Sequence, residues 1–276
     1  MLRQRATSTA LFVPPLIAIV WLGEPWIAIG VALVTGLAAW EVFRLLRAAG
    51  YASFAGLGTT LAVTVVVDAA APLLLAGSGL LLAAVGLILV GAGALQRHDP
   101  REGLATWSAT VFGAFYVALL VFVVRLGAAA PPLPGGAFLA WLGSERGWIA
   151  LLFLVVWAYD TGAYLVGRRY GRRHFMEHIS PFKTIEGLAG GTVAAFVVTA
   201  LMLWALGQPV AGALVLGPLL AAAAQAGDLV ESMLKRAAGS KDSGTLIPGH
   251  GGVLDRIDSF LFAAPVLTLY VVAVVR

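Results

Sequence analysis

The stretch from Ser232 to Asp258 reads SMLKRAAGSKDSGTLIPGHGGVLDRID, a polar interruption between two long apolar runs, 209–234 and 259–275. Apolar runs of this length on both sides predict two membrane-spanning helices joined by a functional loop, and this decides the fold class. Glycine lets backbone N–H groups approach a ligand closely, and acids beside bases suit a metal ion and a phosphate. The charged and histidine side chains of the stretch are Lys235, Arg236, Lys241, Asp242, His250, Asp255, Arg256 and Asp258.

The composition extends this interpretation to the whole chain. Of the 276 residues, 60% are hydrophobic and 12% are charged, the mean hydropathy is +0.93, and cysteine is absent, which excludes disulfides and thiolate metal sites. We predict an all-α polytopic membrane helical bundle of about nine spans, or eight because only a Gly-Ser-Gly turn separates two of the runs. The predicted spans, each near the length of about 20 residues that crosses a bilayer, are 8–23, 25–46, 54–74, 77–96, 106–125, 148–168, 186–207, 209–234 and 259–275.

The placement of basic residues predicts the orientation of these spans. With the N-terminus in the cytoplasm, 15 of the 18 lysines and arginines fall on the cytoplasmic side, and three (Arg125, Arg146 and Arg276) fall outside. The first run is expected to be a retained span, because no small-residue cleavage site follows it. We expect one integral membrane domain over 1–276, with scaffold helices in 1–150 and the catalytic site in 151–276.

A polar stripe runs along the cytoplasmic end of the predicted span 209–234. Its members lie within about one third of the helix circumference at 100° per residue, which indicates a face turned to a cavity or a partner helix: Gln225, Asp228, Glu231, Ser232 and Lys235. An acid at membrane depth is costly and indicates a functional site. The alternative is an Asp228–Lys235 pair that only holds helices together.

Two further acids, Asp255 and Asp258, share one face at the start of the last span. Together with Asp228 they offer hard oxygen ligands of the kind that Mg²⁺ takes while keeping waters and substrate phosphates. The alternative, strongest for Asp258, is that the two acids favour the positive end of the last helix. The loop from Lys241 to Gly252 is expected to cradle phosphate through backbone donors and charge.

A second polar cluster follows the predicted span 148–168. Asp160 shares a helix face with Thr161 and Tyr164 near the inner end of that span, and a run of arginines, 168–173, comes next. Ser180-Pro181 is a helix-start signal, and a helix N-terminus beside Lys183 is an anion site. For the arginines the alternative is that they enforce topology and bind anionic headgroups.

Two acids stand alone within predicted spans of the first half of the chain. We interpret Glu41 as an ion-pair partner of Arg44, three residues later on the same helix. Asp68 has no evident partner in the sequence.

The order of residues in Ser232–Asp258 resembles the C-terminal signature of the phosphatidate cytidylyltransferases (CDP-diacylglycerol synthases), at every fixed position and spacing. Asp160-Thr161, the Gly-Arg segment and Ile179–Gly187 are also similar to that family, although Phe182 stands where many members have a second lysine. The resemblance covers about Val156 to the C-terminus. It implies a paired-metal site carried by acids matching Asp228 and Asp255, with Lys235 nearby.

The resemblance implies an enzyme of phospholipid biosynthesis that joins CTP to phosphatidate and needs Mg²⁺, with a second cation possible. Its expected partners are CTP, phosphatidate and membrane lipids, with no nucleic acid and a homodimer possible, in a bacterial plasma membrane with the site facing the cytoplasm. A cytidylyltransferase for another lipid phosphate and an ion-coupled membrane transporter are the alternatives. We expect catalytic roles for Asp228, Lys235 and Asp255, metal ligation by Asp228 and Asp255, and substrate binding by Asp160, Lys183, Thr184, Ser232, Arg236, Lys241, Asp242, His250, Gly251, Gly252, Arg256 and Asp258.

Overall fold

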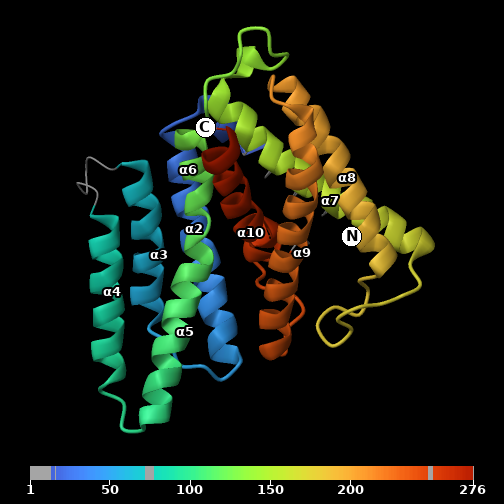
Figure 1. Ribbon diagram of the computed structural model, residues 1–276. Coiled ribbons are helices and arrows are strands. Elements are labelled where there is room, and N and C mark those ends of the chain that lie inside the picture. The colour runs from blue at the N-terminus through green and yellow to red at the C-terminus, as the bar shows by residue number, and fades with distance from the viewer. Residues whose placement is uncertain (1–13, 16, 72–77, 248–250, 276) are drawn as a thin grey trace. The chain divides into compact units, whose positions relative to one another are not determined.

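All regular secondary structure in the described part of the chain is helical (Figure 1), which confirms the all-α prediction. The structure is a computed structural model, and it describes residues 14–15, 17–71, 78–247 and 251–275. Its α-helices are α2 (Trp26–Ala48), α3 (Ala55–Ala70), α4 (Gly79–Ala94), α5 (Pro100–Ala118), α6 (Val121–Ala129), α7 (Ser144–Tyr170), α8 (Ile185–Ala205), α9 (Ala213–Ala237) and α10 (Leu254–Tyr270). The short elements are η1 (Ala140–Leu142), η2 (Val210–Gly212) and the π-helical turn η3 (Val271–Val275).

Six helical segments of the described chain are long and apolar enough to cross a membrane. The segment Pro100–Ala129 combines α5 and α6, while α3 and α4 are apolar but only 16 residues long. Each predicted span from 25–46 onward overlaps one of the helices of the described chain, although 54–74 and 77–96 extend into 72–77, which lies outside the described residues. The predicted span 8–23 lies largely outside the described residues, so the number of spans and the orientation of the N-terminus stay predictions.

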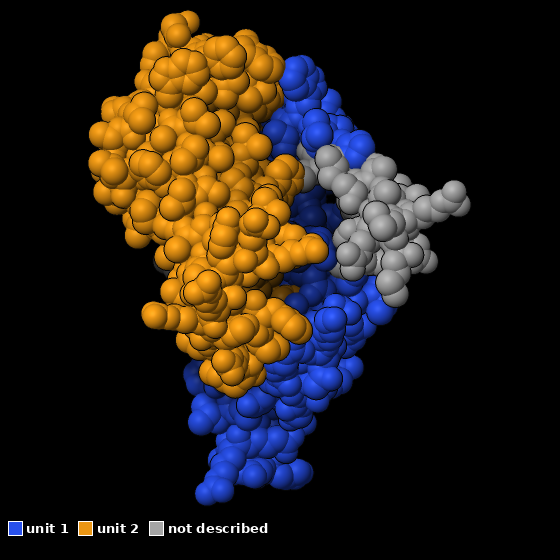
Figure 2. Space-filling model, turned by 90° about the vertical axis from the view of Figure 1, so that its right-hand side faces the viewer, with its two compact units in different colours: residues 1–124, 233–257 blue, residues 125–232, 258–276 orange. Residues whose placement is uncertain are grey.

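The chain forms two compact units, coloured separately in Figure 2, that do not follow the order of the sequence. Unit 1 combines residues 1–124 with 233–257, and unit 2 combines residues 125–232 with 258–276. Helices α9 and α10 therefore each contribute residues to both units, and the signature stretch is divided between them.

Unit 1 is organised around a phenylalanine on α2. The side chain of Phe43 is 1% exposed, and it lies against glycines on α3 and α5. A Cβ atom would come within 2.3 Å of the Phe43 ring at Gly58 and within 2.6 Å at Gly113. The two glycines thus let α3 and α5 approach α2 next to its single acid, Glu41.

Unit 2 contains the closely packed pair α7 and α8, where glycine again permits the approach. A Cβ atom at Gly191 of α8 would come within 2.7 Å of the Tyr159 ring of α7. The same device joins α9 to α10, since a Cβ atom at Gly227 would lie 2.3 Å from the carbonyl oxygen of Asp258. Small residues at such contacts are typical of membrane helix pairs.

Candidate active site

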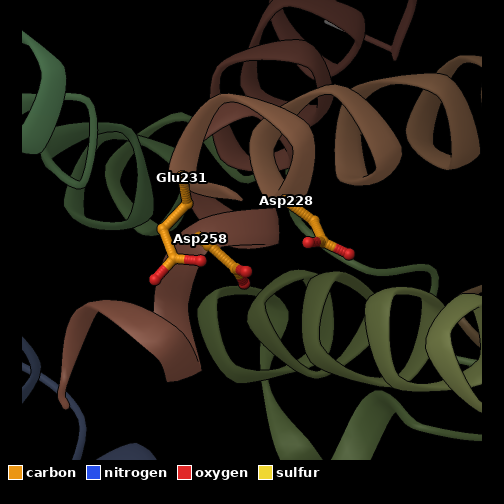
Figure 3. Close-up of side chains that lie close together, drawn as sticks. All are labelled: Asp228, Glu231 and Asp258. Carbon is orange, nitrogen blue, oxygen red and sulfur yellow. The ribbon is translucent and has the colours of Figure 1, made fainter. Parts of the chain in front are cut away.

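Three acids converge where α9 passes α10 in unit 2 (Figure 3). Asp228 and Glu231 come from one face of α9 and Asp258 from the first turns of α10, and each offers a ligand atom within 4.8 Å of the others. Glu231 is fully buried, while the side chain of Asp228 is 32% exposed. We call Asp228, Glu231 and Asp258 the acidic cluster; the glycine at Gly227 allows it to form, because it lets the two helices approach.

The donors around the acidic cluster orient its carboxylates. The ammonium of Lys183 donates to Asp228 Oδ2 at 2.5 Å, and the hydroxyl of Ser232, one turn along α9, donates to Asp228 Oδ1 at 3.3 Å. Asp258 Oδ1 accepts a hydrogen bond of 2.6 Å from the N–H of Ser259. Three carboxylates in so small a volume repel one another, and hard oxygen donors are the ligands that divalent cations prefer. The acidic cluster therefore could hold a metal ion.

Lys183 reaches Asp228 because the segment before α8 folds back on itself. The N–H of Phe175 donates to the carbonyl of Lys183, and the N–H of Ile185 donates to the carbonyl of Arg173. Thr184 then caps α8, since its side chain accepts a hydrogen bond of 3.1 Å from the N–H of Gly187. The helix begins at Ile185, beside Lys183 and within one residue of the predicted span 186–207; only the Ser180-Pro181 signal does not mark its start.

The signature stretch builds a second polar cluster in unit 1 around Asp255. Its Oδ1 accepts a hydrogen bond of 2.7 Å from Lys235 Nζ. Its Oδ2 accepts hydrogen bonds from the N–H of Ser243, the hydroxyl of Ser243 and the N–H of Gly252, at 2.9, 2.8 and 2.8 Å. The side chains of Lys235 and Asp255 are only 13% and 8% exposed, so this ion pair is largely withdrawn from water.

Two glycines of the loop, Gly251 and Gly252, contact the Asp255 carboxylate directly. Gly251 has a φ of +82°, in the left-handed region that favours glycine, and a Cβ atom there would lie 2.5 Å from Asp255 Oδ2. A phosphate that used the N–H of Gly252 would have to displace Asp255, so the cradle predicted from this loop stays a prediction. Lys241 and Asp242 are exposed, and His250 lies outside the described residues.

The remaining predicted residues of the described chain have exposed side chains. Arg236 and Arg256 are exposed, and Arg236 Nη1 donates to the carbonyl of Ser240 at 3.0 Å. Asp160 is exposed on α7, and its neighbour Tyr159 donates a buried hydrogen bond of 2.6 Å to Gln225.

The two predicted metal ligands belong to different units, Asp228 to unit 2 and Asp255 to unit 1. Their common metal site therefore stays a prediction. What the structure brings together is the set of Asp228, Asp258, Ser232 and Lys183 in one unit and the set of Lys235, Asp255, Gly251 and Gly252 in the other.

Two acids outside the predicted site belong to these clusters. Glu231 was recognised as part of the polar stripe but not as a site residue, although its position three residues after Asp228 places it on the same helix face. Glu41 is not bonded to Arg44: it accepts hydrogen bonds from the signature stretch, and Arg44 Nη2 donates to the carbonyl of Ser243 at 2.7 Å. The signal for Glu41 was a lone acid in an apolar span. Asp68 is buried beside Gly79.

A polytopic α-helical membrane protein with a carboxylate cluster suited to a metal ion is the class that this fold and site define. Residues 3–274 match the model of the cytidylyltransferase family, and the chain therefore belongs to this family and is a nucleotidyltransferase.

Relatives with known names agree with this family. The chain is 34% identical to the phosphatidate cytidylyltransferase of Synechocystis sp. over 98% of its own length and 96% of that protein. It is 43% identical to the phosphatidate cytidylyltransferase of Staphylococcus saprophyticus over 46% of this chain and 50% of that protein. The protein of the same name from Staphylococcus aureus is 45% identical over 45% of this chain and 49% of its own length.

Proposed function

We propose that the protein joins CTP to phosphatidate and releases CDP-diacylglycerol and pyrophosphate. The observation that carries the proposal is the match of nearly the whole chain, residues 3–274, to the cytidylyltransferase family, together with a relative named phosphatidate cytidylyltransferase that aligns over 98% of the chain. The polar clusters on α9 and α10 support it, because they supply the acids and lysines that a phosphate-transfer reaction needs.

The proposed reaction forms one phosphorus–oxygen bond and breaks another. An oxygen of the lipid phosphate attacks the α-phosphorus of CTP, the bond from that phosphorus to the bridging oxygen of the β-phosphate breaks, and pyrophosphate leaves with the electron pair. A phosphate monoester has a second pKa of about 6 and is mostly a dianion at neutral pH. The nucleophile therefore needs no strong general base, and the chain's task is to position the two substrates and to offset their charge.

We propose Mg²⁺ as the cation of this site. Asp228, Glu231 and Asp258 would hold it in unit 2. The resemblance implies a metal-ligand role for Asp255 as well. When bound, Mg²⁺ would neutralise charge on the phosphate oxygens. Ser232 would orient Asp228 through the hydrogen bond between their side chains.

The lysines and arginines would bind the phosphates. Lys183 and Lys235 are each held by a carboxylate at 2.5 and 2.7 Å, so their ammonium groups are fixed in place before substrate arrives. Lys241, Arg236 and Arg256 are exposed cations that would attract the triphosphate from solution.

We place the protein in a bacterial plasma membrane with the signature stretch on the cytoplasmic side, where CTP is available. The charge distribution supports this orientation, since 15 of the 18 basic residues then lie on the cytoplasmic side. The lipid substrate keeps its acyl chains in the bilayer, so it would enter the site from the side.

The experiment that tests this function uses the purified protein in detergent with CTP labelled at the α-phosphate. Label should pass into the chloroform-soluble product only when phosphatidate and Mg²⁺ are both present, and label at the γ-phosphate should remain in water as pyrophosphate. A parallel reaction with an isoprenoid glycerol phosphate separates the two lipid substrates. No lipid-soluble label with phosphatidate would overturn the proposal, and transfer to the isoprenoid lipid alone would replace the substrate.

A further inference from the structure

We propose that Glu41 of α2 is a positioning residue for this reaction: it holds the signature loop in the shape that presents Lys235 and Asp255. The inference rests on the proposed function, and it adds a residue that lies far from the signature in the sequence. We call Glu41, Ser243 and Asp255 the carboxylate clasp, because the single hydroxyl of Ser243 lies within hydrogen-bond distance of both carboxylates.

Glu41 acts as a helix cap supplied by another helix. Its Oε1 accepts a hydrogen bond of 3.0 Å from the N–H of Val253, and its Oε2 accepts one of 2.8 Å from the N–H of Leu254. These N–H groups lie at the start of α10, where an α-helix has no partners for its first donors. A carboxylate is favourable at this end of a helix because the helix dipole is positive there.

The loop is shaped to admit this carboxylate. A Cβ atom at Gly244 would come within 2.3 Å of Glu41 Oε1, and one at Gly252 would come within 2.3 Å of Oε2. Neither glycine has a positive φ, so the requirement for glycine arises from the close approach of the Glu41 side chain and, at Gly252, also of the Ser243 hydroxyl. Two glycines of the signature are thus needed to make room for Glu41, which precedes Ser243 by 202 residues in the sequence.

Ser243 connects Glu41 to the ion pair of Asp255 and Lys235. Its hydroxyl lies 2.9 Å from Glu41 Oε2 and 2.8 Å from Asp255 Oδ2, and Asp255 in turn holds Lys235. Arg44, one turn further along α2, donates to the carbonyl of the same serine at 2.7 Å. Helix α2 is therefore hydrogen-bonded to both the side chain and the backbone of Ser243.

A glutamate at this buried position would lower the stability of the fold unless its carboxylate made such contacts. Glu41 is fully buried within an apolar helix, and a buried carboxylate is costly unless it is hydrogen-bonded. Glutamine is the closest test of the role, because it keeps the size of the side chain but has one acceptor oxygen in place of two. In either orientation its NH₂ group would face a backbone N–H at the start of α10, that of Val253 or that of Leu254, so one of these hydrogen bonds would be lost.

The expected result of Glu41→Gln is a change in KM for CTP with kcat preserved. If the loop is in its competent shape only part of the time, the apparent affinity falls by that fraction. We expect KM for CTP to rise about tenfold or more, and kcat and KM for phosphatidate to stay within about threefold. A fall in kcat with an unchanged KM for CTP would overturn the proposal, because it indicates only a smaller folded fraction.

A second measurement is independent of the reaction. The chain has no cysteine, so Thr245→Cys, at an exposed position of the loop, provides a single site for a spin label. In the Glu41→Gln background the label should become more mobile in its electron paramagnetic resonance spectrum. An unchanged spectrum would overturn the positioning role even if the enzyme assay failed for other reasons.

The matched control is Asp99→Ala, which removes a helix cap in the same unit without touching the loop. Asp99 accepts a hydrogen bond of 2.8 Å from the N–H of Arg101 at the start of α5. This variant should leave KM for CTP and the label mobility unchanged. If Glu41→Gln does not fold, Ser243→Ala is the alternative, because it removes only the hydroxyl that lies between Glu41 and Asp255. This variant should raise KM for CTP and the mobility of the label at Thr245, each by less than Glu41→Gln would. If neither KM nor the label mobility changes, the proposal is overturned.

Discussion

The acidic cluster of unit 2 and the carboxylate clasp of unit 1 use the same residue types in opposite ways. In the clasp, Glu41 and Asp255 accept hydrogen bonds from backbone N–H groups, a hydroxyl and a lysine, and the loop folds around them. In the acidic cluster, three carboxylates face one another within 4.8 Å. An acid surrounded by donors thus fixes the shape of a site, whereas three acids that lie together are suited to a cation, although Asp228 also accepts hydrogen bonds from Lys183 and Ser232.

Asp228→Asn should lower the rate of transfer more than any other substitution, because it removes one carboxylate of the acidic cluster and breaks the ion pair with Lys183. Loss of a residue that only supports a metal ligand costs about 10- to 100-fold, so loss of a ligand should lower the rate of transfer from CTP to lipid by more than about 100-fold. The variant should still elute as folded protein in detergent. The control is Glu102→Gln, which disrupts an exposed ion pair with Arg97 and should leave the rate within about twofold.

Retention of more than a tenth of the rate in Asp228→Asn would remove this residue from the proposed ligands. The acidic cluster would then be a structural group, and its difference from the clasp would disappear.

A substitution of Asp255 tests whether this residue contributes to metal binding, to the position of the loop or to both. The resemblance implies that it is a metal ligand, whereas its hydrogen bonds to Lys235, Ser243 and Gly252 make it part of the clasp. We expect Asp255→Asn to raise both the Mg²⁺ concentration for half-maximal rate and the mobility of a label at Thr245, with a rate loss of more than about tenfold. If only one of the two quantities changes, Asp255 belongs to one cluster alone.

Glu231→Gln should change the metal requirement and nothing in the loop. The fully buried side chain keeps its size but loses a charged oxygen, so the Mg²⁺ concentration for half-maximal rate should rise about tenfold. The rate at saturating Mg²⁺ should recover to within a few-fold. Glu41→Gln is the comparison, because it should raise KM for CTP and the mobility of a label at Thr245, which Glu231→Gln should leave unchanged. An unchanged Mg²⁺ titration in Glu231→Gln would exclude it as a ligand.

Gly227→Ala tests the helix contact that assembles the acidic cluster. The added methyl group would meet the carbonyl oxygen of Asp258, so α9 and α10 must separate. Overpacking of this kind costs about 1–3 kcal/mol, which thermal unfolding in detergent can measure. The control is Gly56→Ala on α3, where the methyl group would meet no atom within 4 Å and stability should be equal or slightly higher. Equal stability of both variants would contradict the close contact.

The sequence predicted the helices well and the clusters only in part. Helix lengths follow from hydrophobic runs because the bilayer fixes the length of a span, and α7, predicted over 148–168, extends over Ser144–Tyr170. Asp228 and Glu231 could be placed on one face of a helix by spacing alone. The approach of Asp258 and Lys183 to Asp228 depends on tertiary packing that no local pattern contains.

Glu41 shows why local reasoning failed in the first half of the chain. A basic residue stood three positions away, so a surface ion pair with Arg44 was the nearest explanation. The structure instead connects both residues to Ser243, 199 residues beyond Arg44. The start of α8 at Ile185 agrees with the predicted span 186–207 to within one residue. The helix signal of Ser180-Pro181 starts no helix there, because that segment forms turns and is tied back by the hydrogen bond from the N–H of Ile185 to the carbonyl of Arg173.

The smallest expected effect is that of Arg172→Ala, in the arginine run before α8. Its side chain is exposed, and its backbone N–H donates to Glu186 Oε2 at 3.0 Å whatever the side chain is. The rate should therefore stay within about threefold. Glu186→Ala, in contrast, removes the acceptor for the N–H groups of both Arg172 and Arg173, and so loosens the segment that carries Lys183 to Asp228. A larger loss in Arg172→Ala than in Glu186→Ala would mean that the guanidinium itself contacts substrate, and the arginine run would then join the lysines as part of the phosphate site.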